Sequence, residues 1–167
     1  MLNSAPTKQG KYKQGLFTPK NKDKIIKLNT QGGLFYRSGL ELKMMVYLDN
    51  NPNIIHWGAE HLRVPYTKTE WVSESQEFRT TEHSYYPDFY YELQKANGEV
   101  SRVVAEVKPA SETKEPKLAE NPTSKQLKNF EYALKMYNKN LSKWKHMIEY
   151  CERKDFKFII ITEEHLG

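Results

Sequence analysis

The chain has 167 residues, of which 13% are aromatic and one is cysteine, and its net charge is +5. This aromatic content excludes a compositionally disordered chain, and one cysteine excludes an internal disulfide framework or a cysteine-rich zinc site. No apolar run approaches the roughly 18 residues that a membrane helix needs, and the N-terminus lacks the apolar core of a signal peptide. We therefore expect one domain in a reducing compartment, without membrane contact.

The basic charge is concentrated in residues 1–30, which we interpret as an N-terminal arm before a domain of residues 31–167. The arm holds seven lysines and one acid, Asp23, so its net charge is +6 and the rest of the chain sums to −1. Its few apolar residues predict flexibility. Two roles remain open for it: a solubilising tail, or an arm that contacts nucleic-acid phosphates or docks on a partner protein. The lysines available for such contacts are Lys8, Lys11, Lys13, Lys20, Lys22, Lys24 and Lys27.

The first predicted helix begins at Ser38 and runs to about Asp49, just before a proline. Ser38 and Glu41 have the spacing of a capping box, in which each side chain bonds to backbone at the helix start. Strands are predicted at residues 54–57 and 60–66. The polar stretch 67–82 predicts either a long loop or an extra hairpin.

A hairpin is the clearest local signal in the chain. Two alternating runs, residues 84–93 and 100–108, flank the turn-like Ala96-Asn97-Gly98. Odd positions in both runs are apolar, whereas Asp88, Glu106 and Lys108 occupy even positions. Because side chains alternate between the faces of a strand, one shared apolar face requires even positions to oppose even positions.

The turn length decides this register. A two-residue Asn-Gly turn would give the wrong parity, whereas a three-residue loop with a left-handed Gly98 pairs Lys95 with Glu99. That pairing places Asp88 opposite Glu106, with Lys108 two residues further along on the same face. The burial pattern and the placement of the charges therefore predict the same register.

The rest of the chain predicts one long helix and one strand. Residues 109–122 contain three prolines and predict a mobile loop. Thr123 and Gln126 then have capping-box spacing, and apolar residues follow at steps of three and four as far as Cys151. This stripe favours packing against a sheet, with a coiled coil to a partner chain as the alternative. A strand at 156–162 and a short helix at 162–165 complete an order typical of a mixed α/β domain, with helices covering a small central sheet.

Two carboxylates and an ammonium group on one face suit the hydrolysis of a phosphodiester. That reaction needs a divalent metal, an activated water and neutralised phosphate charge, and hard oxygen ligands favour Mg²⁺. On the residues alone, Asp88, Glu106 and Lys108 could equally form a charged solvent face. Glu41 also has its capping role, which is compatible with a catalytic one. The histidines show no metal-ligand spacing, and no Gly-rich phosphate loop is present, so no nucleotide cofactor is expected.

Taken in order, these motifs resemble the restriction-endonuclease-like superfamily, whose signature is a helical Glu, then Pro-Asp, then Asp/Glu-x-Lys. The chain is similar in particular to the nuclease subunits that cleave transposon ends. The resemblance covers about residues 37–162, although Glu60-His61-Leu62 stands where those nucleases have Gln-Pro. The stretches that carry it are 41–48, Asn51-Pro52, 60–66, Tyr85-Tyr86-Pro87-Asp88-Phe89 and Glu106-Val107-Lys108.

This resemblance implies a core of order α-β-β-β-α-β and a metal-dependent deoxyribonuclease, with endonuclease activity favoured over exonuclease activity. Asp88, Glu106 and the Val107 carbonyl would bind Mg²⁺, with Mn²⁺ as the alternative ion. Lys108 would orient or polarise the attacking water, and Glu41 would complete the outer shell of the metal. Some exonucleases of the superfamily carry Gln-x-x-x-Tyr on the next helix, but here Phe130 replaces the tyrosine, which favours a capping role for Gln126.

A narrower likeness is to the head-completion nucleases of T-even-type tailed phages, which act on packaged DNA before head–tail joining. It implies DNA as substrate, portal or neck proteins as partners of the arm, and action in the host cytoplasm during assembly or in the virion. Two alternatives remain: a structural head–tail joining protein that keeps the fold without catalysis, and a transposase nuclease subunit.

Overall fold

The computed structural model describes residues 3, 5 and 13–167. The elements, in chain order, are β1 (Gly15–Phe17), η1 (Lys22–Lys24), β2 (Leu34–Tyr36), α1 (Gly39–Asn50), β3 (Ile54–Ala59), β4 (Val64–Val72), β5 (Glu77–Tyr85), β6 (Phe89–Gln94), β7 (Val100–Val107), η2 (Ala110–Thr113), α2 (Ser124–Lys154), β8 (Lys157–Ile161) and α3 (Glu163–Leu166). No helix in this described part of the chain is long and apolar enough to cross a membrane.

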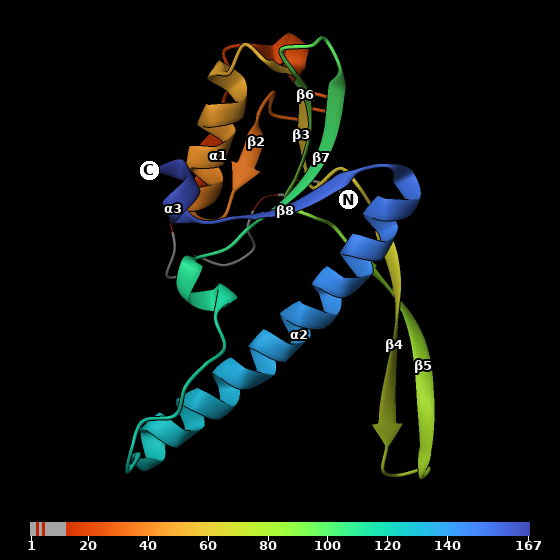
Figure 1. The fold of residues 1–167 in the computed structure, drawn as a ribbon, viewed down its shortest axis with the longest axis vertical. Coiled ribbons are helices and arrows are strands. Elements are labelled where there is room, and N and C mark those ends of the chain that lie inside the picture. The colour runs from red at the N-terminus through yellow and green to blue at the C-terminus, as the bar shows by residue number, and fades with distance from the viewer. Residues whose placement is uncertain (1–2, 4, 6–12) are drawn as a thin grey trace.

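A four-stranded mixed sheet forms the centre of the molecule (Figure 1). Its strand order is β3-β6-β7-β8, in which β3, β6 and β7 are antiparallel and β8 runs parallel to β7. The sequence from α1 to β8 is the predicted α-β-β-β-α-β core, with the β4–β5 hairpin inserted between β3 and β6. The mixed α/β architecture is therefore confirmed.

The α1 face of the sheet carries the larger core. Odd-numbered strand residues, such as Phe89 and Ala105, pack with Met44 and Leu48 of α1 and with Trp57 of β3. All five of these side chains are at most 1% exposed. This is the apolar face that the parity of the hairpin predicts.

The α2 face carries a smaller core, which confirms that part of the apolar stripe of this helix packs on the sheet. Tyr90 and Val104 lie at even positions and are buried against Met147 and Cys151 of α2. The even face is therefore apolar in its middle and charged at both ends, with Glu92 opposite Arg102 at one end and Glu106 and Lys108 at the other. Glu106 and Lys108 lie at the end of β7, beside Asp88.

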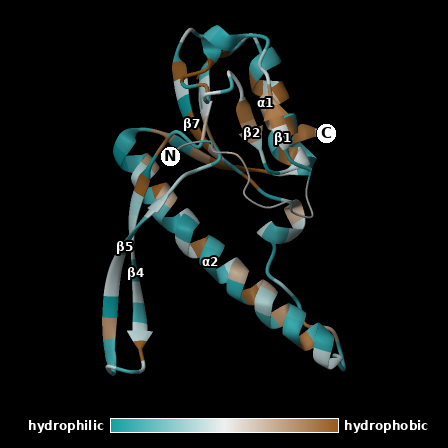
Figure 2. Cartoon of the chain, turned by 180° about the vertical axis from the view of Figure 1, so that it is seen from behind, coloured by the Kyte–Doolittle hydropathy of each residue, from teal (hydrophilic) through white to brown (hydrophobic). Residues whose placement is uncertain are grey.

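Helix α2 packs on the sheet only through its C-terminal part. Its buried residues are Trp144, Met147 and Cys151, whereas Leu127 and Leu141 are exposed. The first half of the helix extends away from the sheet, with polar and apolar residues interspersed (Figures 1 and 2). The expectation that the whole apolar stripe packs on a sheet is therefore wrong, because the sheet is shorter than the helix.

The polar stretch after β3 forms a hairpin, which decides between the two alternatives left open for residues 67–82. Strands β4 and β5 pair in a continuous antiparallel register and project from the sheet beside α2 (Figure 1). The predicted strand at 84–93 is divided, since β5 ends at Tyr85 and β6 begins at Phe89. The predicted strand at 60–66 begins only at Val64, because Glu60 adopts a left-handed φ of 52°.

Residues 13–30 pack on the body, contrary to the expected flexibility of the arm. Strand β1 pairs with β2, and the backbone N–H of Ile26 donates to the carbonyl of Trp57 at 2.9 Å. The carboxylate of Asp49, at the end of α1, accepts the N–H groups of Lys20 (2.8 Å) and Asn21 (3.1 Å). Buried polar contacts compensate for the low apolar content of this segment.

The proline-rich segment 109–122 begins with an anchored turn. The short helix η2 has a buried Ala110, whose N–H donates to the Glu163 carboxylate of α3 at 2.8 Å. Thr113 donates its hydroxyl to the Ala110 carbonyl at 2.7 Å. The chain leaving β7 is therefore held against α3 before it reaches the start of α2, and this part of the predicted mobile loop has fixed contacts.

Candidate active site

The β6–β7 register brings Asp88 and Glu106 together. Strand pairing places Phe89 opposite Ala105, which extends by one position to Asp88 opposite Glu106. The turn has the predicted three-residue form: the Lys95 N–H donates to the Glu99 carbonyl, and Gly98 has a φ of 85°. The predicted register is therefore confirmed.

Reciprocal hydrogen bonds fix the two carboxylates at the strand end. One Asp88 carboxylate oxygen accepts the N–H of Val107 at 2.8 Å. A Glu106 carboxylate oxygen lies 3.4 Å from the N–H of Asp88. Each carboxylate thus faces a backbone N–H group of the opposite strand. Its remaining oxygen lone pairs stay available for a cation.

Burial makes the negative charge of this pair unfavourable. The pKa of Asp88 lies well above its usual value, first because the group is buried and second because Glu106 is close. Burial also raises the pKa of Glu106, which is only 6% exposed, although Lys108 partly offsets this effect. A cation between the two carboxylates would stabilise both charges, since opposite charge favours the ionised form.

Glu41 reaches the same end of the sheet from the first turn of α1. Its N–H donates to the Ser38 hydroxyl at 3.1 Å, which is half of the predicted capping box. Its carboxylate, however, accepts the N–H of Arg37 at 2.8 Å instead of that of Ser38. Burial raises the pKa of Glu41, and its charge in turn raises the pKa of Asp88. Glu41 is therefore an electrostatic neighbour of the carboxylate pair.

Glu60 is an acid at this end that the sequence analysis did not assign to the site. Its N–H donates to the Asp88 carbonyl at 3.0 Å, and its carboxylate forms an ion pair with Arg37. Glu60 also raises the pKa of Glu41 through its charge. The left-handed backbone at Glu60 directs this loop past the strand end, and the sequence carries no clear signal for it.

Lys143 and Tyr85 approach the pair from the α2 side. The Lys143 ammonium lies 5.1 Å from the centre of the Tyr85 ring and interacts electrostatically with Glu106 and Asp88. The buried Tyr85 side chain interacts with Glu106, and burial together with the charge of Glu106 and a hydrogen bond to it raises the pKa of Tyr85. Sequence reasoning missed Lys143, although lysines at 135, 139 and 143, four residues apart, mark one helix face.

Val107, the third predicted metal ligand, lies beside Asp88 at the end of β7. Its N–H points toward β6, where it meets Asp88, and the carbonyl of the same residue faces the same neighbouring strand. The register continues to Pro87 opposite Val107, and proline has no N–H to donate. The strand partner therefore leaves this carbonyl oxygen open.

These residues fit a divalent metal held by two carboxylates and a carbonyl, with water completing the shell. Within the part of the chain that the structure describes, no three acidic, histidine or cysteine side chains converge as a ready-made metal cluster. Mg²⁺ is commonly bound through one or two carboxylates and several waters, so the pair is a sufficient protein contribution. Lys108 lies two residues from Glu106 and interacts electrostatically with both carboxylates.

The predicted arm lysines lie elsewhere. Lys8 and Lys11 are outside the described residues. Lys20 and Lys24 contact the end of α1 at Asp49, about 12 Å along that helix from Glu41. The Lys24 ammonium donates to the carbonyls of Asp49 and Asn51, whereas Lys13, Lys20, Lys22 and Lys27 are exposed. Lys20 and Lys24 therefore lie away from the carboxylate pair.

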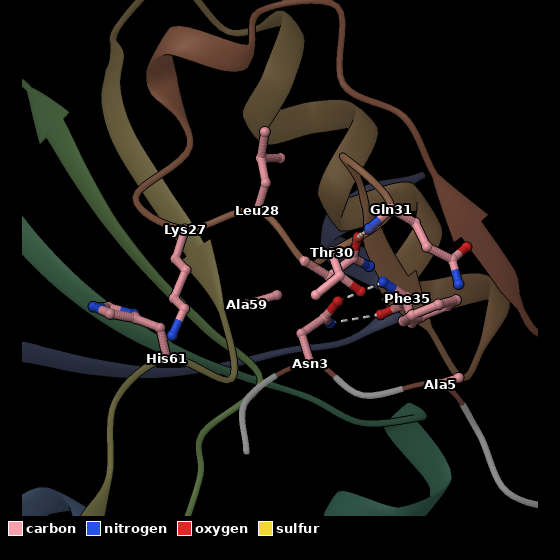
Figure 3. Close-up of a pocket in the computed structure, with 10 residues that line it drawn as sticks. Asn3, Ala5, Lys27, Leu28, Thr30, Gln31, Phe35, Ala59 and His61 are labelled. Carbon is pink, nitrogen blue, oxygen red and sulfur yellow. Dashed lines mark hydrogen bonds between the residues drawn. The ribbon is translucent and has the colours of Figure 1, made fainter.

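Lys27 lines a cavity of about 410 Å³ that is distinct from the carboxylate pair (Figure 3). In this cavity, Asn3 forms two hydrogen bonds with the backbone of Phe35, and the His61 side chain lies beside Lys27. None of the ten lining residues is acidic. The cavity therefore offers no carboxylate chemistry of its own.

Comparisons with known proteins agree with this geometry. The family model for the TnsA-like endonuclease N-terminal domain matches residues 51–163, which include Asp88 and Glu106 but not Glu41. The head completion nuclease of Enterobacteria phage T4 is 30% identical over 152 residues, which are 91% of this chain and 92% of that protein. No solved structure gives a significant match. The chain therefore belongs to the TnsA-like endonucleases, DNA nucleases with a restriction-endonuclease-like fold.

Proposed function

We propose that the chain hydrolyses DNA phosphodiesters at Asp88, Glu106, Lys108 and Glu41, using Mg²⁺, with Mn²⁺ as a substitute. The observation that carries this proposal is the register that places Asp88 against Glu106 at a strand end, with both carboxylate pKa values raised. Two repelling, buried carboxylates lower the stability of the fold, and a bound cation provides a reason to keep them.

Each residue has a defined task in this proposal. Asp88, Glu106 and the Val107 carbonyl hold the ion, which when bound polarises the phosphate and lowers the pKa of water. Lys108 hydrogen-bonds the attacking water and balances the charge that builds on the phosphate. Glu41 accepts a hydrogen bond from water in the outer shell of the ion and keeps that water in place.

The proposed biological role is that of a head completion nuclease, acting on packaged DNA before head–tail joining. It is supported by similarity to the phage T4 protein of that name along nearly the full length of both chains. The role implies action in the host cell during particle assembly, with portal or neck proteins as partners of residues 1–30. Endonucleolytic cleavage is supported by the matching family model, whose description is an endonuclease.

A cleavage assay on circular and linear plasmid DNA with Mg²⁺ tests the proposal. The wild type should cut both forms, since an endonuclease needs no free end, whereas Asp88→Asn and Lys108→Gln should each lose at least about 100-fold in rate. A rate loss of that size equals or exceeds the largest loss that usually follows removal of a residue in the outer shell of a metal site.

Glu99→Gln is the matched control, because Glu99 lies in the exposed turn of the same hairpin and pairs only with Lys95. It should cut as the wild type does. Cleavage of linear DNA alone would replace endonuclease with exonuclease activity. Unchanged cleavage in both site variants would overturn the proposed site, and particle assembly supported by both variants would leave the structural joining role.

A further inference from the structure

Helix α2 carries a row of lysines, although residues 31–167 as a whole have a net charge of only −1. Residues 124–148 hold six lysines and one glutamate, so this segment alone has a net charge of +5. Five of the six form what we call the lysine row: Lys125, Lys128, Lys135, Lys139 and Lys143.

Helical geometry places the row on one side of α2. At 3.6 residues per turn, the five positions fall within an arc of about 80°, and Lys143 lies directly below Lys125 after five turns. Tyr132 falls in the same arc and is 68% exposed. The apolar stripe, represented by Leu134 and Leu141, lies roughly opposite. The first four lysines of the row are exposed, and Lys143 is partly buried.

The row conflicts with the preferences of an isolated helix. Lys135, Lys139 and Lys143 are successive like charges four residues apart, and each such pair costs about 0.2–0.5 kcal/mol. Lys125 and Lys128 lie near the positive N-terminal end of the helix dipole, and no acid occupies the first turn. Among the described residues, none of the five forms an ion pair within 4.0 Å, and Lys135 interacts with Glu70 only at longer range.

The row ends at the carboxylate pair. Lys143 lies over Tyr85 and interacts with Glu106, and Lys139 is its neighbour one turn earlier. A strand that follows the row along α2 would therefore be led from solvent to the site.

We propose that the lysine row binds the phosphate backbone of DNA and directs the scissile phosphate to Asp88 and Glu106. The inference rests on the proposed function and adds the surface that holds the substrate. Such contacts are independent of sequence, since phosphates carry no base information.

The dimensions of the row agree with this assignment. From Lys125 to Lys143 the helix rises about 27 Å. Duplex DNA rises about 3.4 Å per base pair, so the row is as long as about eight base pairs. A duplex laid along α2 could therefore meet several of the five lysines.

The salt dependence of DNA binding tests the row separately from catalysis. Binding of a duplex is measured at several salt concentrations without divalent cations, so that no cleavage occurs. The triple variant Lys128→Gln, Lys135→Gln, Lys139→Gln should lower the slope of log K against log salt by about 2.7, at about 0.9 per phosphate contact. Its affinity at low salt should fall at least about tenfold.

The matched control removes the same charge off the row. Lys95→Gln, Lys145→Gln, Lys157→Gln replaces three exposed lysines, of which Lys95 lies at the β6–β7 turn, Lys145 lies on the opposite face of α2 and Lys157 lies in β8. Its slope should fall by much less than that of the row variant. An unchanged slope in the row variant, or an equal fall in both variants, would overturn the inference.

Asp88→Asn separates this inference from the proposed function. It keeps the row, so it should bind DNA with at least the wild-type slope while losing cleavage. If the row variant binds and cuts as the wild type does while Asp88→Asn cuts nothing, the inference fails and the proposed function stands. If the row controls binding but the wild type cuts nothing with Mg²⁺, the proposed function fails and the row remains a DNA-binding surface.

Discussion

The two faces of the central sheet are covered to different extents, and the candidate site lies where the thinner cover ends. On one face, α1 and the β1–β2 segment close a core that includes Trp57, Phe89 and Leu48. On the other, the last part of α2 and Val64 of β4 pack on the sheet, around Met147 and Val104. The α2 face leaves Asp88 and Lys108 partly exposed at the strand end, although Glu106 is buried.

A matched pair of substitutions measures this difference in packing. Met44 and Met147 are both fully buried, one on each face. Methionine-to-alanine changes in cores cost about 2–5 kcal/mol, and the cost rises when the surroundings cannot collapse. We expect the loss in free energy of unfolding to lie in the upper part of that range for Met44→Ala and in the lower part for Met147→Ala. Denaturant unfolding measures both losses. Equal losses would mean that the two faces are equally rigid.

Lys143 tests whether the open part of the α2 face contributes to activity. Lys143→Gln should lower kcat/KM about tenfold, because the lysine interacts with Glu106 and would lie beside the bound phosphate. Stability should change little or rise slightly, since burial and Lys139 already lower the pKa of Lys143. Lys145→Gln, two residues away and exposed, should match the wild type in steady-state kinetics. A tenfold loss of kcat/KM in both variants would mean that the effect comes from the overall positive charge of the helix and not from the position of Lys143.

The smallest expected effect is a pH dependence of stability. The folded state raises the pKa values of Asp88 and Glu106 above their usual values, near 4, so it favours their protonated forms. This contribution is complete below about pH 4 and is lost as pH rises through the folded-state pKa values. Without divalent cations, the Tm of the wild type should therefore fall by a few degrees relative to Asp88→Asn as pH rises.

Mg²⁺ should reverse this trend in the wild type, because a metal displaces protons from its ligands and binds only the folded site. Thermal unfolding at pH 5 and pH 8, with chelator and with Mg²⁺, measures both effects. A Tm difference between wild type and Asp88→Asn that stays constant across this range would contradict the assigned burial of the pair.

Local patterns in the sequence were sufficient for α1, α2, β8 and the β6–β7 hairpin. The cap at Ser38, the capping box at Thr123 and the left-handed Gly98 each specify backbone geometry within a few residues, and all three are present. The register of Asp88 against Glu106 followed from parity and turn length alone. The catalytic roles of these residues stay a prediction that the cleavage assay addresses.

Long-range packing decided what local patterns could not. The apolar stripe of α2 predicted burial along its whole length, yet Leu127 is exposed, because periodicity shows which face is apolar and not how far the sheet extends. Residues 13–30 were expected to be flexible from their composition, yet Asp49 anchors them through backbone N–H groups that composition does not show.

The sequence by itself determined the two main helices, the β6–β7 hairpin and the alignment of the two carboxylates, because these depend on contacts between residues close in the chain. Only the tertiary structure decided that Glu41, Glu60 and Lys143 approach Asp88 from three separate elements, and that the lysine row leads to them. Those approaches depend on how α1 and α2 cross the ends of the sheet, which is set by packing between distant segments.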